Sequence, residues 1–137
     1  MDWKSRTVLV GGGASFIGSH PAGAIIERAA KLRTVDNASS RLENIHGHPY
    51  ARRIEFINAD VLKPGIAGQV VEGIDIVFHL AANHGGRGYV DLHQAACATN
   101  LTLDGMLSQA FLKARVQKVN YASSLCVNPN YLQTDPN

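Results

Sequence analysis

The run of residues 8–20, VLVGGGASFIGSH, constrains the fold of this chain more than any other stretch. Residues 6–10 are typical of a buried strand, and the three glycines that follow predict a tight turn into a helix. Gly12 permits the turn, the small Ser15 lets a diphosphate approach the backbone, and Gly18 lets the helix pack closely on the strand. A strand, a turn and a helix in this order present free helix N–H groups, so the run predicts a phosphate-binding turn.

An acidic residue follows the second predicted strand. Residues 32–35 are a second apolar run, which ends in Asp36, 24 residues after Gly12. Dinucleotide-binding folds place an acid about 20 residues beyond the glycine turn, where it accepts hydrogen bonds from the adenosine ribose. A carboxylate there repels a 2′-phosphate and favours NAD over NADP, whereas the neighbouring Arg33 and Arg41 weaken that preference. Together the two features predict a dinucleotide site.

The rest of the chain alternates strands and helices. We predict further strands at residues 53–58, 75–82 and 116–122, and helices at residues 15–30, 41–45, 63–72 and 89–114. Pro21 should kink the first helix or displace a backbone bond near Ile17. Right-handed crossovers between five parallel strands predict an α/β, doubly wound (Rossmann) sheet of order 3-2-1-4-5. Its switch point should bring the glycine turn, Asp36, Ala81 and Ser124 to one crevice.

Composition predicts one soluble domain over residues 1–137. The chain is 45% hydrophobic, enough for a core, and its net charge of +2 is too small to indicate a nucleic-acid partner. No apolar run is long enough to span a membrane, and the first residues, MDWKSR, lack the apolar core of a signal peptide. Cys97 and Cys126 are far apart in the sequence and indicate free thiols, so we expect a cytoplasmic protein.

Several polar residues allow two interpretations. Asp60 follows the third strand and either meets the adenine amino group or caps a helix. His79 inside the fourth strand is interpreted as a core histidine, and Asn100 as a structural amide that bonds a neighbouring loop. The pair His46 and His48 is interpreted as part of a surface loop, so no metal site is predicted.

Four motifs, GGASFIGSH, VDN, HLAA and YASS with a following cysteine, resemble the extended short-chain dehydrogenase/reductase family of NAD-dependent nucleotide-sugar epimerases and dehydratases. The loop NHGGRGYV and the run SSLCVNP are most similar to its GDP-mannose 3,5-epimerase branch. The resemblance covers essentially the whole chain but only the N-terminal part of such an enzyme. It implies an NAD(P)-binding domain truncated before the substrate domain, a nucleotide-sugar substrate and a homo-oligomer.

The resemblance also implies roles for individual residues. Ser124 corresponds to the catalytic residue that hydrogen-bonds the sugar hydroxyl, and Cys126 to the cysteine acid/base of the 3,5-epimerase branch. Gly85 and Gly86 are expected to approach the substrate sugar. The residues implied in binding the cofactor are Gly12, Ser15, Phe16, Ile17, Gly18, Asp36, Asn37, Asp60, Val61, Leu80, Ala81 and Ala82.

The family's catalytic Tyr-x-x-x-Lys pair is not found in these 137 residues. None of Tyr50, Tyr89, Tyr121 and Tyr131 has a lysine four residues later. Without that pair hydride chemistry has no proton acceptor, so we expect nucleotide binding without turnover.

Two other classes of function stay open. One is a non-catalytic Rossmann interaction module that associates with itself, since the edge of the fifth strand and nearby apolar faces would be exposed. The other is a site for S-adenosylmethionine, which also uses a glycine loop and an acid after the second strand. The FIG sequence after the turn and the serine pair after the fifth strand favour NAD.

Overall fold

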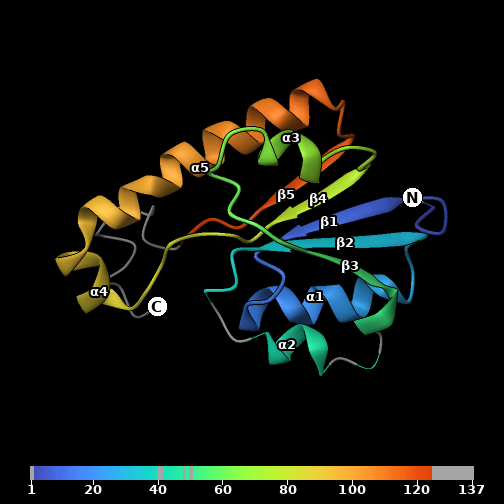
Figure 1. Ribbon diagram of the computed structural model, residues 1–137, viewed down its shortest axis with the longest axis horizontal. Helices are drawn as coiled ribbons and strands as arrows, with labels where there is room; N and C mark the ends of the chain where they lie inside the picture. Colours follow the sequence, from blue (N-terminus) through green and yellow to red (C-terminus); the bar gives the residue numbers. More distant parts are fainter. Residues whose placement is uncertain (1, 40–41, 48, 50, 125–137) are drawn as a thin grey trace, which may run out of the picture.

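A five-stranded parallel sheet forms the centre of the protein in a computed structural model, which describes residues 2–39, 42–47, 49 and 51–124. The strands are β1 (Thr7–Gly11), β2 (Lys31–Asp36), β3 (Ile54–Asn58), β4 (Ile76–His79) and β5 (Lys118–Tyr121). Their order is β3-β2-β1-β4-β5, and every neighbouring pair is parallel (Figure 1). The predicted α/β, doubly wound architecture and its strand order are therefore confirmed.

Helices cover both faces of the sheet. They are α1 (Phe16–Ile26), α2 (Glu43–His46), the 3-10 turn η1 (Ala51–Arg53), α3 (Ile66–Val70), α4 (Arg87–Leu92) and α5 (Gln94–Lys113). In Figure 1, α1 and α2 lie on one side of the strands and α3 and α5 on the other. Among the described residues, no helix is both long enough and apolar enough to cross a membrane.

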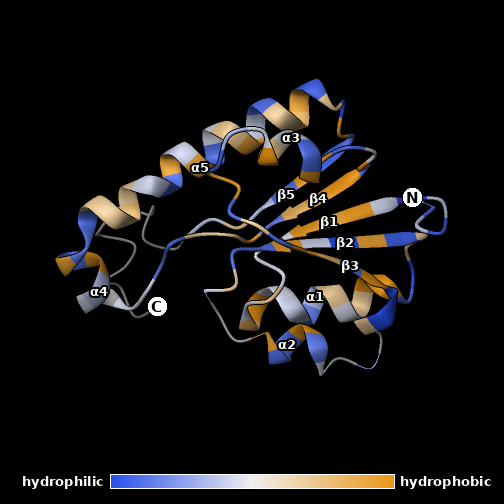
Figure 2. Ribbon diagram, in the orientation of Figure 1, coloured by the Kyte–Doolittle hydropathy of each residue, from blue (hydrophilic) through white to orange (hydrophobic). Residues whose placement is uncertain are grey.

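The apolar strands build a core on each face. Val8 and Val10 face α1 and pack with Ile25 and Ile26, whereas Leu9 faces α5 and packs with residues such as Leu107. This alternation follows from the two-residue period of a strand. Because both faces are covered, β1 is apolar at consecutive positions, and β1 and β4 are coloured largely as hydrophobic (Figure 2).

The region 89–114, predicted as one helix, is two helices, so that prediction is wrong. α4 and α5 meet at His93, whose backbone leaves the helical region with φ −128° and ψ 40°. The His93 ring stacks on Tyr89, with centroids 4.3 Å apart, and its Nδ1 lies 3.0 Å from the Tyr89 carbonyl oxygen. Helical spacing of apolar side chains continues across this break, because the backbone resumes a helix at once.

Two other helices are shorter than predicted. α1 ends at Ile26 because the chain turns toward β2, where the N–H groups of Ala30 and Lys31 donate to the Arg6 carbonyl oxygen. α3 begins only at Ile66, since Gly65 before it adopts φ +83°. Pro21 does lie inside α1, where it has no N–H to donate to the carbonyl oxygen of Ile17.

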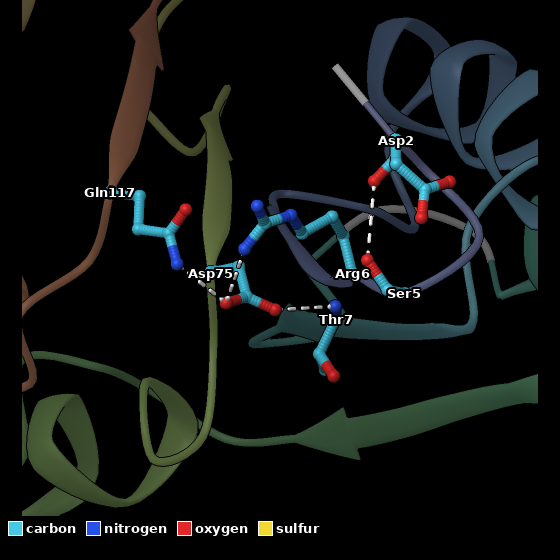
Figure 3. Close-up of polar contacts among 6 residues, drawn as sticks. All are labelled: Asp2, Ser5, Arg6, Thr7, Asp75 and Gln117. Carbon is cyan, nitrogen blue, oxygen red and sulfur yellow. Dashed lines mark hydrogen bonds and ion pairs between the residues drawn. The ribbon is translucent and has the colours of Figure 1, made fainter.

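One carboxylate holds the N-terminal end of the sheet together (Figure 3). Asp75 Oδ2 accepts from the backbone N–H of Thr7 at 2.9 Å. Its Oδ1 accepts from Gln117 Nε2 at 3.0 Å and from Arg6 Nη1 at 3.4 Å. β1, β4 and the entry to β5 are thereby fixed at the end opposite the glycine-rich turn.

Candidate functional site

A pocket of about 560 Å³ opens at the carboxyl ends of the strands. Its walls come from the ends of β1 and β2, the segments after β3 and β4, and the helices α4 and α5. This is the switch point of the strand order, where open parallel sheets bind their ligands. The predicted cofactor residues that line it are Gly12, Ser15, Asp36, Asn37, Asp60, Val61, Ala81 and Ala82.

Steric crowding requires a glycine at positions 12 and 18. Gly12 has φ +76°, and a Cβ there would lie 2.9 Å from the backbone of Ala81. A Cβ on Gly18 would overlap the carbonyl oxygen of Gly12. The turn therefore brings the first helix against the strand and leaves the loop backbone open to the pocket, as the spacing predicted.

Ser15 caps α1 and shapes its first turn. Its backbone is extended, with φ −69° and ψ 163°, and its Oγ accepts from the Gly18 N–H at 3.1 Å. The same hydroxyl donates to the Gly12 carbonyl oxygen at 2.6 Å. The N–H groups of Phe16 and Ile17 are left without an acceptor in the described part of the chain, as at any helix start. They are the groups that can bind an anion.

The exposed side chains at this helix start do not line the pocket. Phe16 is 74% exposed and Ile17 is 61% exposed. Only their backbone is suited to the role that the resemblance implies. The N–H of Gly18 is taken by Ser15, so the part that Gly18 plays is to allow close packing.

Asp36 lies where the sequence predicted it, beside the glycine-rich turn. Its side chain is buried, with 9% of the residue exposed. Oδ2 accepts from the Ala14 N–H at 3.1 Å, and Oδ1 accepts from the Ala38 N–H at 3.0 Å. The carboxylate therefore stands on the pocket wall with a fixed orientation.

Arg33 is directed away from that wall. Its Nη1 donates to the carbonyl oxygens of Val70 and Glu72, at 3.0 and 2.9 Å, at the end of α3. Its Nε also lies 3.0 Å from the Glu55 carboxylate. A residue engaged in this way is not placed to bind a 2′-phosphate at Asp36. Arg41 lies outside the described residues.

Asp60 fixes the turn that follows β3. Its Oδ1 accepts from the Leu62 N–H at 2.9 Å. α3 begins only at Ile66, with Gly65 as its N-cap and no side-chain cap, so the prediction that Asp60 caps a helix is wrong. The second interpretation, contact with adenine, stays a prediction, and Asp60 does line the pocket.

The loop after β4 is fixed by two asparagines. Asn100 Oδ1 accepts from the Asn83 N–H at 2.7 Å, and its Nδ2 donates to the Asn83 carbonyl oxygen at 2.9 Å. The predicted structural role of Asn100 is confirmed. Tyr89 donates its hydroxyl to Asn83 Oδ1 at 2.9 Å. Asn83 and Tyr89 line the pocket but are not among the site residues predicted from the sequence. The position of an aromatic residue beside a glycine-rich loop could have indicated a binding site there.

Other predicted site residues lie outside the pocket wall. Leu80 packs against the core on the α1 side of the sheet. Gly85, Gly86 and Ser124 are exposed and are not among the residues that line the pocket. Cys126 lies outside the described residues. No group of three or more potential metal ligands occurs within the part of the chain that the structure describes.

His79, on the pocket wall, belongs to a polar cluster with Asp104 and Tyr121. His79 is 4% exposed, and its Nε2 lies 2.8 Å from Asp104 Oδ1. Tyr121 donates its hydroxyl to Asp104 Oδ2 at 2.6 Å. This hydrogen bond, with some desolvation and the negative charge of Asp104, raises the pKa of Tyr121 above its ordinary value. His79 is a core residue as predicted, but its partner was missed, although Asp104 is the single charge between residues 94 and 112.

Comparisons with known proteins agree with this geometry. Residues 8–137 match the profile described as the NAD dependent epimerase/dehydratase family. The chain is 33% identical over 121 residues to 3 beta-hydroxysteroid dehydrogenase/Delta 5-->4-isomerase of Mycobacterium tuberculosis, covering 85% of this chain and 31% of the relative. It is 30% identical over 139 residues to GDP-mannose 3,5-epimerase 1 of Oryza sativa subsp. japonica, covering 98% of this chain and 35% of the relative.

A solved structure shows the same fold. UDP-glucose 4-epimerase from Brucella ovis, in complex with NAD, superimposes with a TM-score of 0.76 at 27% identity. The match covers 88% of this chain and 36% of that one. The chain thus spans about a third of the length of the proteins to which it is similar.

Proposed function

Because the chain belongs to the NAD dependent epimerase/dehydratase family, we propose that its pocket binds NAD and that it is the NAD-binding domain of a nucleotide-sugar epimerase or dehydratase. One observation carries the proposal. The acid at the end of β2 and the glycine-rich turn after β1 meet on one wall of the pocket, with Asp36 Oδ2 3.1 Å from the Ala14 nitrogen. A dinucleotide needs both groups, one for its diphosphate and one for its ribose.

The residues present suit the dinucleotide. The N–H groups of Phe16 and Ile17, which have no acceptor among the described residues, would hold the diphosphate at the positive end of the α1 dipole. Asp36 would accept from the ribose hydroxyls, and Asp60 lies on the side where adenine would rest. Ala81 and Ala82 offer small side chains to the nicotinamide end. When bound, NAD supplies a hydride acceptor at that end.

The same wall favours NAD over NADP. A 2′-phosphate would bring negative charge against the buried carboxylate of Asp36, at considerable electrostatic cost. Arg33, which is close to Asp36 in the sequence, does not offset this cost, because its guanidinium donates to the carbonyl oxygens of Val70 and Glu72.

The 137-residue chain alone is proposed to bind without turning over a sugar. Ser124 and Cys126 would face the nucleotide-sugar substrate, by the resemblance. A proton acceptor for the sugar hydroxyl is needed as well, and no Tyr-x-x-x-Lys pair occurs in this sequence. The substrate and the reaction are therefore those of the whole enzyme.

Isothermal titration tests the binding half of the proposal. NAD titrated into the 137-residue chain should bind with a Kd below about 1 mM, and NADP should bind more weakly. S-adenosylmethionine in the same cell is the control for specificity. Absence of heat with NAD, or tighter binding of S-adenosylmethionine, contradicts NAD as the ligand. Turnover of UDP-glucose or GDP-mannose by this chain with NAD would contradict only the proposed lack of turnover.

A second candidate is self-association as a non-catalytic module. Three leucines on α4 and α5 are largely exposed, namely Leu92 at 82%, Leu101 at 78% and Leu112 at 80%. A second copy of this chain would bury such apolar side chains, and its own edge strand could pair with β5. Light scattering should show a dimer or larger species, and a monomer at high protein concentration would contradict this candidate.

A further inference from the structure

One buried ring nitrogen on the pocket wall has no hydrogen-bond partner within the described part of the chain. His79 Nδ1 makes no hydrogen bond to any residue that the structure describes, although only 3% of the side chain is exposed. A buried acceptor left in this state is unfavourable, because it has lost its water and gained nothing in exchange. Such an atom usually marks a place for a ligand group or an ordered water.

Asp104 determines which form of the imidazole is present. Its Oδ2 accepts the hydroxyl proton of Tyr121 at 2.6 Å, and its Oδ1 faces His79 Nε2 at 2.8 Å. An ionised carboxylate can only accept hydrogen bonds, so Nε2 carries the proton. In the neutral ring, Nδ1 is then an unprotonated nitrogen with a free lone pair.

Nδ1 lies beside the space that a side chain on Gly11 would fill. Gly11 on β1 is the register partner of His79 on β4. A Cβ built on Gly11 would lie 3.6 Å from Nδ1 and 3.8 Å from the Cβ of Ala81. All three residues line the pocket, so the space left by the missing side chain is continuous with it.

We propose that this space is a hydrogen-bonding subsite for one hydroxyl group, with His79 Nδ1 as its acceptor. The donor is an O–H, either from a water molecule held in the free protein or from a hydroxyl of the bound ligand. A phosphate oxygen does not fit, because it would set its own lone pairs against that of Nδ1. The subsite is independent of the proposed function, and only its use by NAD depends on that proposal.

Two substitutions of Gly11 test the subsite in the unliganded protein. Gly11→Ala and Gly11→Ser add the same Cβ, which would make ordinary contacts at a position without positive φ. Only the serine brings a hydroxyl within reach of Nδ1. Thermal unfolding should therefore show a Tm for Gly11→Ser that is about 3 °C or more above that of Gly11→Ala.

As a control, the same two Gly11 variants are compared in a protein that also carries His79→Gln. A glutamine can keep an N–H donor toward Asp104 but has no acceptor in the place of Nδ1. The difference between serine and alanine at position 11 should vanish there. Equal Tm values for the two variants in the native background overturn the proposal, as does a difference that persists in the His79→Gln background.

The wild-type protein distinguishes the two sources of the hydroxyl. Both Gly11 variants also gain stability from the loss of a glycine, so the two sources are distinguished by the Tm shift that NAD produces in each protein. If a ligand supplies the hydroxyl, NAD raises the wild-type Tm more than that of Gly11→Ser. If a water supplies it, NAD raises the two Tm values equally. The comparison without ligand stands whether or not NAD binds, so failure of the subsite and failure of the proposed function are separable.

Discussion

The carboxylate of Asp36, at the end of β2, accepts a 3.1 Å hydrogen bond from the backbone N–H of Ala14 in the glycine-rich turn. Its other oxygen accepts from Ala38 at 3.0 Å. A carboxylate offers about four acceptor positions, so both bonds can persist while a ribose hydroxyl is bound. The geometry of the phosphate-binding turn and the proposed ribose contact therefore depend on one side chain.

Asp36→Asn should weaken NAD binding at least about tenfold, which is 1.4 kcal/mol, because a hydrogen bond to a charged acceptor becomes one to a neutral amide. NADP should lose less affinity, since the repulsion of its 2′-phosphate is removed at the same time. Titration calorimetry with both nucleotides measures the two changes.

Asp60→Asn is the matched control for that experiment. It removes the same charge from the same pocket, and an asparagine oxygen can still accept from the Leu62 N–H. Its effect on NAD affinity should be smaller than that of Asp36→Asn. Equal losses for the two variants would mean that net charge in the pocket, and not the ribose contact, determines affinity.

Gly18→Ala should be strongly destabilising, by about 2 kcal/mol or more, because its Cβ would overlap the carbonyl oxygen of Gly12. Gly105→Ala is the matched control. Gly105 is also helical, on α5, and a Cβ there meets nothing within 4 Å. That variant should be more stable by about 0.5–1 kcal/mol. Urea unfolding gives both values, and similar effects of the two substitutions would contradict this account of the turn.

The strands of the sheet were predictable because each is recognisable from its own local sequence. Apolar runs such as residues 8–10 are buried on both faces, and turn residues bound them. The break at His93 was not predictable in this way, since apolar spacing records which face is buried and not the backbone angles at a single residue. The start of α3 also depended on one local feature, the positive φ of Gly65.

The candidate site was predictable in part for the same kind of reason. Gly12, Ser15 and Asp36 are governed by spacing within one strand–helix–strand unit, and the structure brings them to one pocket. Contacts between segments that are distant in the sequence were harder to predict. The bond between Asp104 on α5 and Tyr121 on β5 joins residues 17 apart through tertiary packing, which no local pattern encodes.

Pro21→Ala should stabilise the protein by about 2 kcal/mol, because the alanine N–H can donate to the Ile17 carbonyl oxygen and the proline ring no longer crowds the preceding turn. Chemical unfolding measures the change. Pro64→Ala is the control, since Pro64 lies outside any helix and its loss should give no comparable gain. An unchanged stability of Pro21→Ala would mean that α1 already accommodates the missing bond.

Asp75→Ala should cost about 1–3 kcal/mol of stability, because the N–H of Thr7 and the amide of Gln117 lose their shared acceptor. NAD affinity should not change, since Asp75 contacts Thr7 at the start of β1 and does not line the pocket. Unfolding and calorimetry are measured on the same variant. Weaker NAD binding below the unfolding transition would indicate coupling between the two ends of the sheet.

Tyr121 should titrate later than an ordinary tyrosine, because its hydroxyl proton is held by the Asp104 carboxylate. A pKa raised above the unfolded value stabilises the protonated, folded form. This contribution is fully present below about pH 10 and is lost as the pH rises through the folded pKa. Ultraviolet titration of tyrosinate should show one late group that Tyr121→Phe removes. Asp104→Asn should bring its pKa back toward the ordinary value, and a titration curve unchanged by Asp104→Asn would show that the hydrogen bond does not control Tyr121.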